Sequence, residues 1–542
     1  MTADFLDKDS PKNELPFSIN KISFAGWLGD FDLENRVETL SSISMVLKCL
    51  KQAPIETELR LFFLQKITPI IEQLSQQLQQ DYKKSCFPFS EEDTLKLQLS
   101  ADCAMEMAQN YSVLCERKEF KTKQLFTQQQ KAQVIQSGIQ FQGEQLLYKS
   151  LLYQKPEQGF WGLCFLFYLY AKQNDVLELE IDFRQTCFLN DFKLVLLFEL
   201  SNVQQFNAEE LIAVHGLLNR FSQYALLINE VPEKKFRGIP YINLRVDEPP
   251  SLPKKENIQQ QPYLFYISSL NVIRTLLEQS TNKISLEGCY KSTLMRLIKA
   301  LTMNEQRKSD RDSVDDKLYA IVGFDKVKHY FVAKNKSTKK ALAPGEVRDL
   351  DFDIDENEMQ HINPDEFRSE REANLTISTE FHILEHVDSS DIWMSRKQKA
   401  KQKANKPVAN IGLVDKSSSG YRLSLKGVVT KVGDSIAVVI SDDLVITVVR
   451  RIMQITADEI QVGVEVLGSD VELLNVVDRN SKSETALYLK SENNMESILI
   501  GVDDFQNEDY LFADLNEKRI RFHIDKQLFM SSTFRHLKVS LA

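Results

Sequence analysis

The stretch LVDKSSSGYRL, from Leu413 to Leu423, decides how the C-terminal half of this chain is interpreted. Its ends belong to runs in which apolar and polar residues alternate, and a polar Asp-Lys-Ser-Ser-Ser-Gly run separates them. Asp and Ser favour turns because their side chains bond nearby backbone groups, and Gly tolerates positive φ. The same residue types can also hold a ligand. The stretch therefore predicts either a plain turn between two strands or a ligand site built on such a turn.

Short strands with period-2 alternation continue from Ala409 to the end of the chain, with turn signals between them. Upstream, DKLYAIVGF also reads as a strand. This pattern predicts one small antiparallel β-barrel or two, and it leaves open whether the strands after Asp478 complete the first barrel. The segments concerned are YRLSLKGVVTKV, SIAVVIS, LVITVVRRIMQI, IQVGVEVL, TALYLK, SILIGV, DYLFAD, KRIRFHID and HLKVSLA.

The N-terminal part has a helical pattern from about Asn35 to Val231, with apolar residues three and four positions apart. LRLFFLQKITPIIEQLSQQLQQDY and AEELIAVHGLLNRFSQYALLI are the clearest cases. A Pro-containing linker follows, then an expected helix pair, YLFYISSLNVIRTLLEQS and CYKSTLMRLIKALTMNEQ. We therefore expect an α+β multidomain protein: an all-α helical domain at 1–235, a linker and helix pair at 236–300, a β-barrel at 301–478 and a C-terminal β subdomain at 479–542.

Composition excludes several classes of protein. The 542 residues are 43% hydrophobic, enough for three or so domains of ordinary size. The formal net charge of −10 argues against a broad nucleic-acid surface, so an anionic ligand requires a local basic cluster. The longest apolar run, FWGLCFLFYLYA, is too short to span a membrane and predicts a buried helix. No secretory signal is visible, and seven cysteines without a CxxC pair predict reduced, buried thiols in a cytoplasmic protein.

Three motif-like strings carry little weight. HILEH, at His382–His386, resembles a zinc-protease pattern but lies among β-branched residues and serines. DFDIDE, from Asp351, lacks the Gly and final Glu of a calcium loop. RKQKAKQKANK, at Arg396–Lys406, is typical of a solubilising linker. With no P-loop, dinucleotide fingerprint or nucleophile elbow, we expect neither a catalytic residue nor a metal site, and we do not expect an enzyme.

A second informative string, QRKSDRD, places Arg307 and Arg311 four residues apart, just before the strand DKLYAIVGF. Taken alone, this spacing is ordinary surface charge. On a segment that enters a barrel, however, the two planar guanidinium groups can pair with phosphates bidentately and stack on bases.

Together, these elements resemble the PilZ domain, the bacterial receptor module for cyclic di-GMP. The signature of that family is R-x-x-x-R before the first barrel strand and [D/N]-x-S-x-x-G at the turn after the second. Arg307 and Arg311 match the first half, and Asp415, Ser417 and Gly420 match the second. The resemblance implies that the arginines meet the phosphates and guanine faces, that Asp and Ser bond a guanine edge, and that Gly lets the backbone approach.

The resemblance extends from about Leu301 to Asp478, and VVRRIM and VGVEVL look like later strands of the same barrel. We add, as our own inference, that Lys308, Lys416 and Arg422 supply local positive potential. One departure is large: roughly a hundred residues separate the two motif halves, most of them in a charged insertion at about 334–406. Barrel closure can still join the halves, because lengthening an already long loop adds little entropy cost.

The sequence thus predicts a cyclic di-GMP receptor with no cofactor besides that ligand. By resemblance, its output is surface attachment or pilus-type motility through a protein partner of the helical domain. The alternative is a ligand-free PilZ-like scaffold, which the long gap between the motif halves favours and the completeness of both halves opposes.

Overall fold

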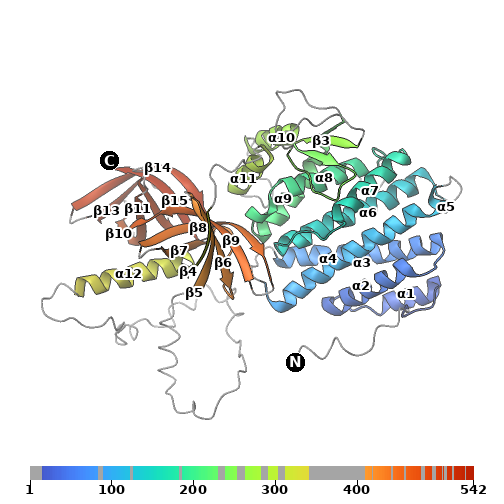
Figure 1. Ribbon diagram of the computed structural model, residues 1–542, viewed down its shortest axis with the longest axis horizontal. Coiled ribbons are helices and arrows are strands. Elements are labelled where there is room, and N and C mark those ends of the chain that lie inside the picture. Colours follow the sequence, from blue (N-terminus) through green and yellow to red (C-terminus); the bar gives the residue numbers. More distant parts are fainter. Residues whose placement is uncertain are drawn as a thin grey trace, which may run out of the picture. The chain divides into compact units, whose positions relative to one another are not determined.

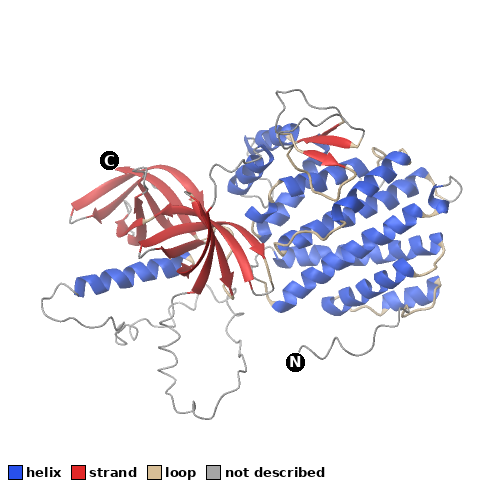
Figure 2. Ribbon diagram, in the orientation of Figure 1, coloured by secondary structure: helices blue, strands red, loops and turns tan. Residues whose placement is uncertain are grey.

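The fold is given by a computed structural model of the chain (Figure 1). It describes residues 15–82, 89–121, 126–181, 186–229, 239–252, 263–281, 291–302, 312–340 and 409–541, the last range with short gaps at 418, 441–442, 457–458, 478–482, 491–495, 503, 506–508, 516–517 and 532. Helices dominate the N-terminal part of the described chain and strands the C-terminal part, as Figure 2 shows. The α+β multidomain expectation is confirmed.

The helical domain begins where Asn20 caps the first helix, its side chain accepting a hydrogen bond from the backbone N–H of Ser23. Thr127 with Gln130, and Asn207 with Glu210, form capping boxes that fix where two later helices begin. The α-helices are α1 Lys21–Gly29, α2 Arg36–Gln52, α3 Thr57–Tyr82, α4 Glu91–Glu116, α5 Lys118–Lys121, α6 Gln128–Leu151, α7 Phe160–Gln173, α8 Phe188–Leu200 and α9 Ala208–Phe221, with 3₁₀ turns η1 Val203–Gln205 and η2 Ser222–Tyr224.

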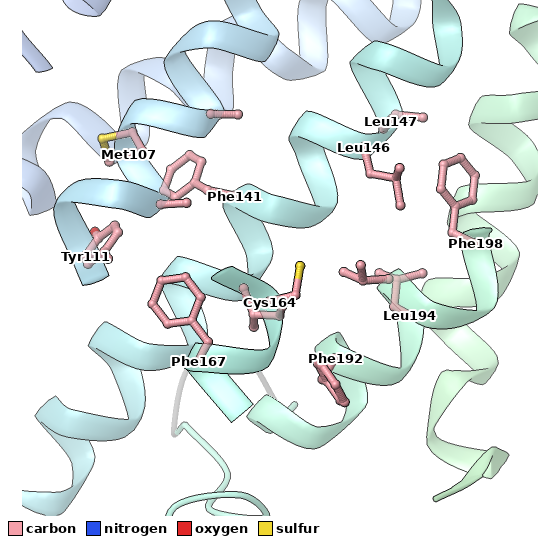
Figure 3. Close-up of a cluster of buried hydrophobic side chains, with 14 of the residues drawn as sticks. Met107, Tyr111, Phe141, Leu146, Leu147, Cys164, Phe167, Phe192, Leu194 and Phe198 are labelled. Carbon is pink, nitrogen blue, oxygen red and sulfur yellow. The ribbon is translucent and has the colours of Figure 1, made fainter. Parts of the chain in front are cut away.

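The core of this domain lies around α6, which packs against both α4 and α7. Figure 3 shows Phe141 of α6 above Phe167 of α7. A Cβ built on Gly138, in the middle of α6, would overlap the Phe167 ring. The glycine therefore lets the aromatic ring reach the α6 backbone, although glycine in a helix interior costs roughly 1 kcal/mol relative to Ala. The apolar run FWGLCFLFYLYA forms most of α7 and is largely buried, as expected.

The helix-pair prediction was wrong at one point. YLFYIS, expected to begin a helix, forms strand β3 (Leu264–Ser268), and only the residues after it form helix α10 (Leu270–Thr281). The strand pairs with β1 (Leu226–Ile228) and β2 (Tyr241–Asn243) in a small antiparallel sheet of order β1-β3-β2. The strand is buried along its length, so its apolar run carries no alternation that would separate it from a buried helix. Helix α11 (Lys291–Thr302) follows as expected.

The first barrel is closed and antiparallel, with strand order β4-β5-β6-β9-β8-β7. Apolar side chains such as Leu423, Leu425 and Val462 fill its interior. The strands are β4 Asp312–Val322, β5 Ala409–Ser417, β6 Gly420–Lys426, β7 Ser435–Ile440, β8 Asp443–Gln454 and β9 Glu459–Gly468.

The remaining strands form a second closed barrel, of order β10-β11-β12-β15-β14-β13. Counted along the chain, both barrels have the order 1-2-3-6-5-4, so the second repeats the topology of the first. It begins at Asp470, inside the segment assigned to the first barrel from the sequence. Its strands are β10 Asp470–Val477, β11 Ser483–Lys490, β12 Glu496–Gly501, β13 Tyr510–Leu515, β14 Lys518–Met530 and β15 Phe534–Leu541.

Tyr153, just after α6, joins the helical domain to the first barrel. Its side chain packs within the barrel core cluster, and its hydroxyl donates to the carbonyl of Phe206 at 2.8 Å. Its own carbonyl accepts from the backbone N–H of Gln454 on β8 at 3.3 Å. Tyr153 adopts a left-handed backbone with φ of 53°, a conformation that costs free energy in a non-glycine residue.

Lys328–Val408 separates from the rest of the chain as a second unit. The structure describes only its first residues, which continue helix α12 (Phe324–Lys340). Helix α12 was not expected, and its last part overlaps the start of the charged insertion. HILEH, DFDIDE and RKQKAKQKANK lie outside the described residues.

In the described chain, Cys103, Cys115, Cys164 and Cys187 are buried free thiols, and burial raises the pKa of Cys103 and Cys164 well above the ordinary value. No described helix is both long and apolar enough to cross a membrane. The described residues also contain no cluster of three His, Cys, Asp or Glu side chains suited to a metal ion.

Candidate functional site

The stretch that opened the sequence analysis is a tight hairpin between β5 and β6, with Ser417 paired to Gly420. The Ser417 hydroxyl donates to the Gly420 carbonyl at 3.1 Å and closes the turn. The backbone N–H of Val466 on β9 donates to the carbonyl of Ser419 at 3.0 Å, which ties the turn to the next strand. The prediction of a turn between two strands is therefore confirmed.

Gly420 lies where strands β6 and β9 approach closely. A Cβ built on it would overlap the carbonyl oxygen of Val464, a backbone atom that cannot move without disturbing the ladder. The last residue of the motif is thus required to be glycine by the barrel itself, because no side chain fits there.

Asp415, the first motif residue, lies on β5 opposite Arg422 on β6. Its carboxylate forms an ion pair with the Arg422 guanidinium at 3.1 Å. The Asp415 side chain is only 12% exposed and that of Arg422 is 32% exposed, so the pair lies at the edge of solvent. Lys416 between them in sequence is exposed. The hairpin therefore carries both signs of charge beside its turn.

The long insertion between the two halves of the motif does not keep their strands apart, because β4 pairs with β5. Asp312, the first residue of β4, pairs with Lys416, and Ser313 pairs with Asp415. Arg311 directly precedes Asp312 in the sequence. The strand that follows the R-x-x-x-R half therefore starts beside the D-x-S-x-x-G half, however many residues the excursion contains. Arg307, Lys308 and Arg311 themselves lie outside the described residues.

The outer face of the barrel continues from the hairpin across β9. Arg422 pairs with Gly463, and Gly420 pairs with Glu465. Gly463 has no side chain, so the surface beside Arg422 is shallow, and the first side chain beyond it belongs to β8.

Strand β8 contributes two consecutive arginines to this face, which the sequence reasoning missed. The register shifts between Val449 and Arg451, so a β-bulge inserts Arg450 as an extra residue. Regular alternation would turn only one of the two arginines outward, whereas Val449 and Ile452 on either side are both buried. The Arg450 guanidinium binds Glu465 at 2.6 Å. The adjacent pair of arginines in VVRRIM was the signal that could have indicated this bulge.

This face suits an anionic, planar ligand. It offers guanidinium groups from Arg422, Arg450 and Arg451, carboxylates from Asp415 and Glu465, and flat backbone at its glycines. Arginine recognises phosphates and stacks on planar rings, while a carboxylate accepts the hydrogen bonds of a guanine edge.

Comparison with protein families identifies the first barrel, with its motif hairpin, as a PilZ domain. A family model described as "Cyclic-di-GMP receptor FimW, middle PilZ domain" matches residues 241–472, and one described as "Cyclic-di-GMP receptor FimW, N-terminal domain" matches residues 22–232. The chain belongs to this cyclic-di-GMP receptor family. No curated protein and no solved structure matches it.

The two family models divide the chain much as the fold does. The first ends soon after the helices of the N-terminal domain, and the second ends near the close of β9, so nearly all of the second barrel lies beyond both. In that barrel the hairpin β11–β12 is the counterpart of β5–β6, and its connecting sequence, SENNM, carries no D-x-S-x-x-G motif.

Proposed function

We propose that the chain binds cyclic di-GMP on the outer face of the first barrel and is a receptor rather than an enzyme. Asp415 and Ser417 bond a guanine edge, Gly420 keeps the backbone accessible, and Arg307 and Arg311 meet the phosphates and stack on the bases. The observation that carries the proposal is the pairing of β4 with β5, because it starts the strand after Arg311 beside Asp415. The match to the middle PilZ domain of the cyclic-di-GMP receptor family adds independent support.

Lys308, Lys416 and Arg422 add positive potential in a chain whose formal net charge is −10. Asp415 must serve both Arg422 and the ligand. A carboxylate has two oxygens and about four acceptor sites, so one ion pair does not by itself exhaust it.

Such a receptor acts in the cytoplasm. Its output is control of surface attachment or pilus-type motility, exerted through a protein partner that binds the helical domain. The second candidate is a ligand-free PilZ-like scaffold. The Asp415–Arg422 ion pair favours this scaffold, because a motif carboxylate that binds an arginine of the neighbouring strand also has a purely structural role.

Calorimetric titration of the full chain with cyclic di-GMP, with GTP as the ligand control, separates the two candidates. We expect saturable binding of cyclic di-GMP alone. Arg311→Ala should weaken it by about 30-fold, since a charge-assisted bond is worth about 1.5–3 kcal/mol. Arg307→Ala should act in the same direction.

Arg274→Ala is the matched control, because Arg274 is an exposed arginine on α10, away from the barrel strands. Wild-type affinity in Arg307→Ala and Arg311→Ala would contradict the site. No heat with the wild type would contradict the receptor function and leave the scaffold.

A further inference from the structure

A large cavity opens beside the motif face of the first barrel. Its volume is about 1090 Å³. Its walls come from α11, from β8 and β9, from β14 of the second barrel, and from residues near the end of α8 such as Asn202 and Gln205. Sites for small molecules typically have about 300–1,000 Å³, so this one is large enough for a dinucleotide. Nothing in the sequence motif predicts it, because its walls come from several distant parts of the chain.

The walls of the cavity are strongly basic. Five cationic side chains line it, whereas Glu465 is the sole carboxylate among the described residues of the wall. The cationic residues are Lys291, Arg296, Lys299, Arg450 and Arg451. Such a concentration of positive charge opposes the net charge of −10 for the whole chain, and it selects an anionic ligand.

Helix α11 presents part of this charge in a regular way. Lys291, Met295 and Lys299 are four residues apart, so they lie on one helix face, and all three are exposed. The opposite face of α11 carries Leu294 and Leu297, which are buried. The lysines are therefore held toward the cavity by the packing of the helix rather than by a flexible loop.

Another wall adds apolar and planar surface. Phe529 and Met530 of β14 line the cavity, and the Arg450 guanidinium lies 4.3 Å from the centroid of the Phe529 ring. Arg296 on α11 is bound to Glu210, so it is fixed in place beneath the lysines. Cations beside apolar and aromatic surface are the combination that a nucleotide requires, with its phosphates on the cations and its base on the flat groups.

The cavity and the motif face are continuous through Glu465. This residue pairs with Gly420 of the hairpin on one side and binds Arg450 on the other. A ligand on the hairpin therefore lies one strand away from the cavity.

We propose that cyclic di-GMP held by the hairpin extends into this cavity, where Lys291 and Lys299 of α11 contact a phosphate and Arg451 of β8 adds a third cation. This inference rests on the proposed function. The ligand would then touch the barrel and the helical part of the chain at once. Binding would fix α11 against β8, which supplies a physical route from ligand to helical domain.

The test is titration of the full chain with cyclic di-GMP in wild type, in Lys291→Ala/Lys299→Ala, and in Lys48→Ala/Lys66→Ala. Lys48 and Lys66 are exposed lysines on helices α2 and α3, outside the cavity, so the control removes the same charge. We expect the α11 variant to bind about tenfold more weakly, since it loses two partly exposed charge contacts to the ligand. The control should bind as the wild type does.

Hydrogen exchange provides a second readout that does not depend on affinity. Saturating cyclic di-GMP should slow amide exchange in α11 and β8 of the wild type. Equal affinity of all three proteins, or unchanged exchange in α11 of a saturated wild type, would overturn the inference while the proposed function stands. A wild type that binds no cyclic di-GMP would overturn both.

Discussion

At the scale of single residues, Gly420 owes its identity to the neighbouring strand before any ligand arrives. Because a Cβ there would overlap the Val464 carbonyl, Gly420→Ala must push β6 away from β9. Overpacking of this kind costs about 1–3 kcal/mol, so we expect the free energy of unfolding to fall by about 2 kcal/mol. The same shift distorts the Ser417 turn, so affinity for cyclic di-GMP should fall as well. Urea denaturation followed by circular dichroism measures the stability.

Gly412→Ala is the matched control for this prediction. Gly412 lies on β5 of the same barrel, where a new Cβ would meet the Ser424 Cβ at 3.5 Å, an ordinary contact. We expect a change smaller than about 0.5 kcal/mol there, as for most substitutions that create no clash. If both variants unfolded at the same urea concentration, the close approach of β6 and β9 would not be what requires the glycine.

At the scale of the element, strand β15 buries a titratable group. His536 is 5% exposed, lies opposite Leu499 and Phe529, and has no hydrogen-bond partner for Nε2 in the described part of the chain. Burial, together with the charge of Arg450, lowers the pKa of His536 to about 4 from the ordinary value of 6.5. The neutral ring is therefore the form that the folded strand accepts.

This lowered pKa predicts how stability depends on pH. Between pH 6.5 and pH 4 the unfolded chain binds a proton on His536 that the folded chain does not bind. The stabilisation that comes from the neutral His536 ring is therefore complete above pH 6.5, and it is lost as the pH falls toward 4. The free energy of unfolding should fall between pH 7 and pH 4.5. We expect this fall to be about 2 kcal/mol smaller in His536→Gln than in the wild type.

Urea denaturation at both pH values measures this difference, with His329→Gln as the control because His329 is exposed on α12. The same loss in His536→Gln and wild type would show that His536 titrates normally in the folded chain.

Elements also differ in how far the sequence predicts them. Strand β6 was predictable because the buried Leu423 and Leu425 alternate with polar residues. Strand β10 was not, because only Ser469 separates it from β9, so the two strands follow each other almost without a break. The hairpin of the candidate site was likewise found from its motif. The other walls of the site could not be predicted from the sequence, because the bulge in β8 and the packing of α11 depend on tertiary structure.

At the scale of the whole molecule, the two barrels share a topology and differ in chemistry. The first carries the motif hairpin, whereas the counterpart hairpin of the second has the sequence SENNM. The barrels are in contact, because the Arg450 guanidinium of β8 lies 4.3 Å from the centroid of the Phe529 ring of β14. Phe324, at the start of α12, also stacks on Phe534 of the second barrel, with ring centroids 5.2 Å apart. The second barrel thus contributes to the setting of the site without a motif of its own.

The link between helical domain and barrel depends on Tyr153, which is 3% exposed and packs within the barrel core. Removing a buried aromatic side chain costs about 3 kcal/mol or more, so Tyr153→Ala should weaken this link. In the wild type we expect the helix and strand signals of circular dichroism to disappear at one urea concentration, because the domains support each other. In Tyr153→Ala the two signals should separate.

Tyr224→Ala serves as the control, because Tyr224 is 43% exposed and lies in the helical domain. It should keep coincident transitions close to those of the wild type. If Tyr153→Ala also kept coincident transitions at the wild-type urea concentration, the packing of the Tyr153 side chain in the barrel core would not couple the two domains. Coupling would then rest on contacts that the substitution leaves in place, such as the backbone bond from the N–H of Gln454 to the carbonyl of residue 153 and the side-chain hydrogen bond between Gln154 and Gln454.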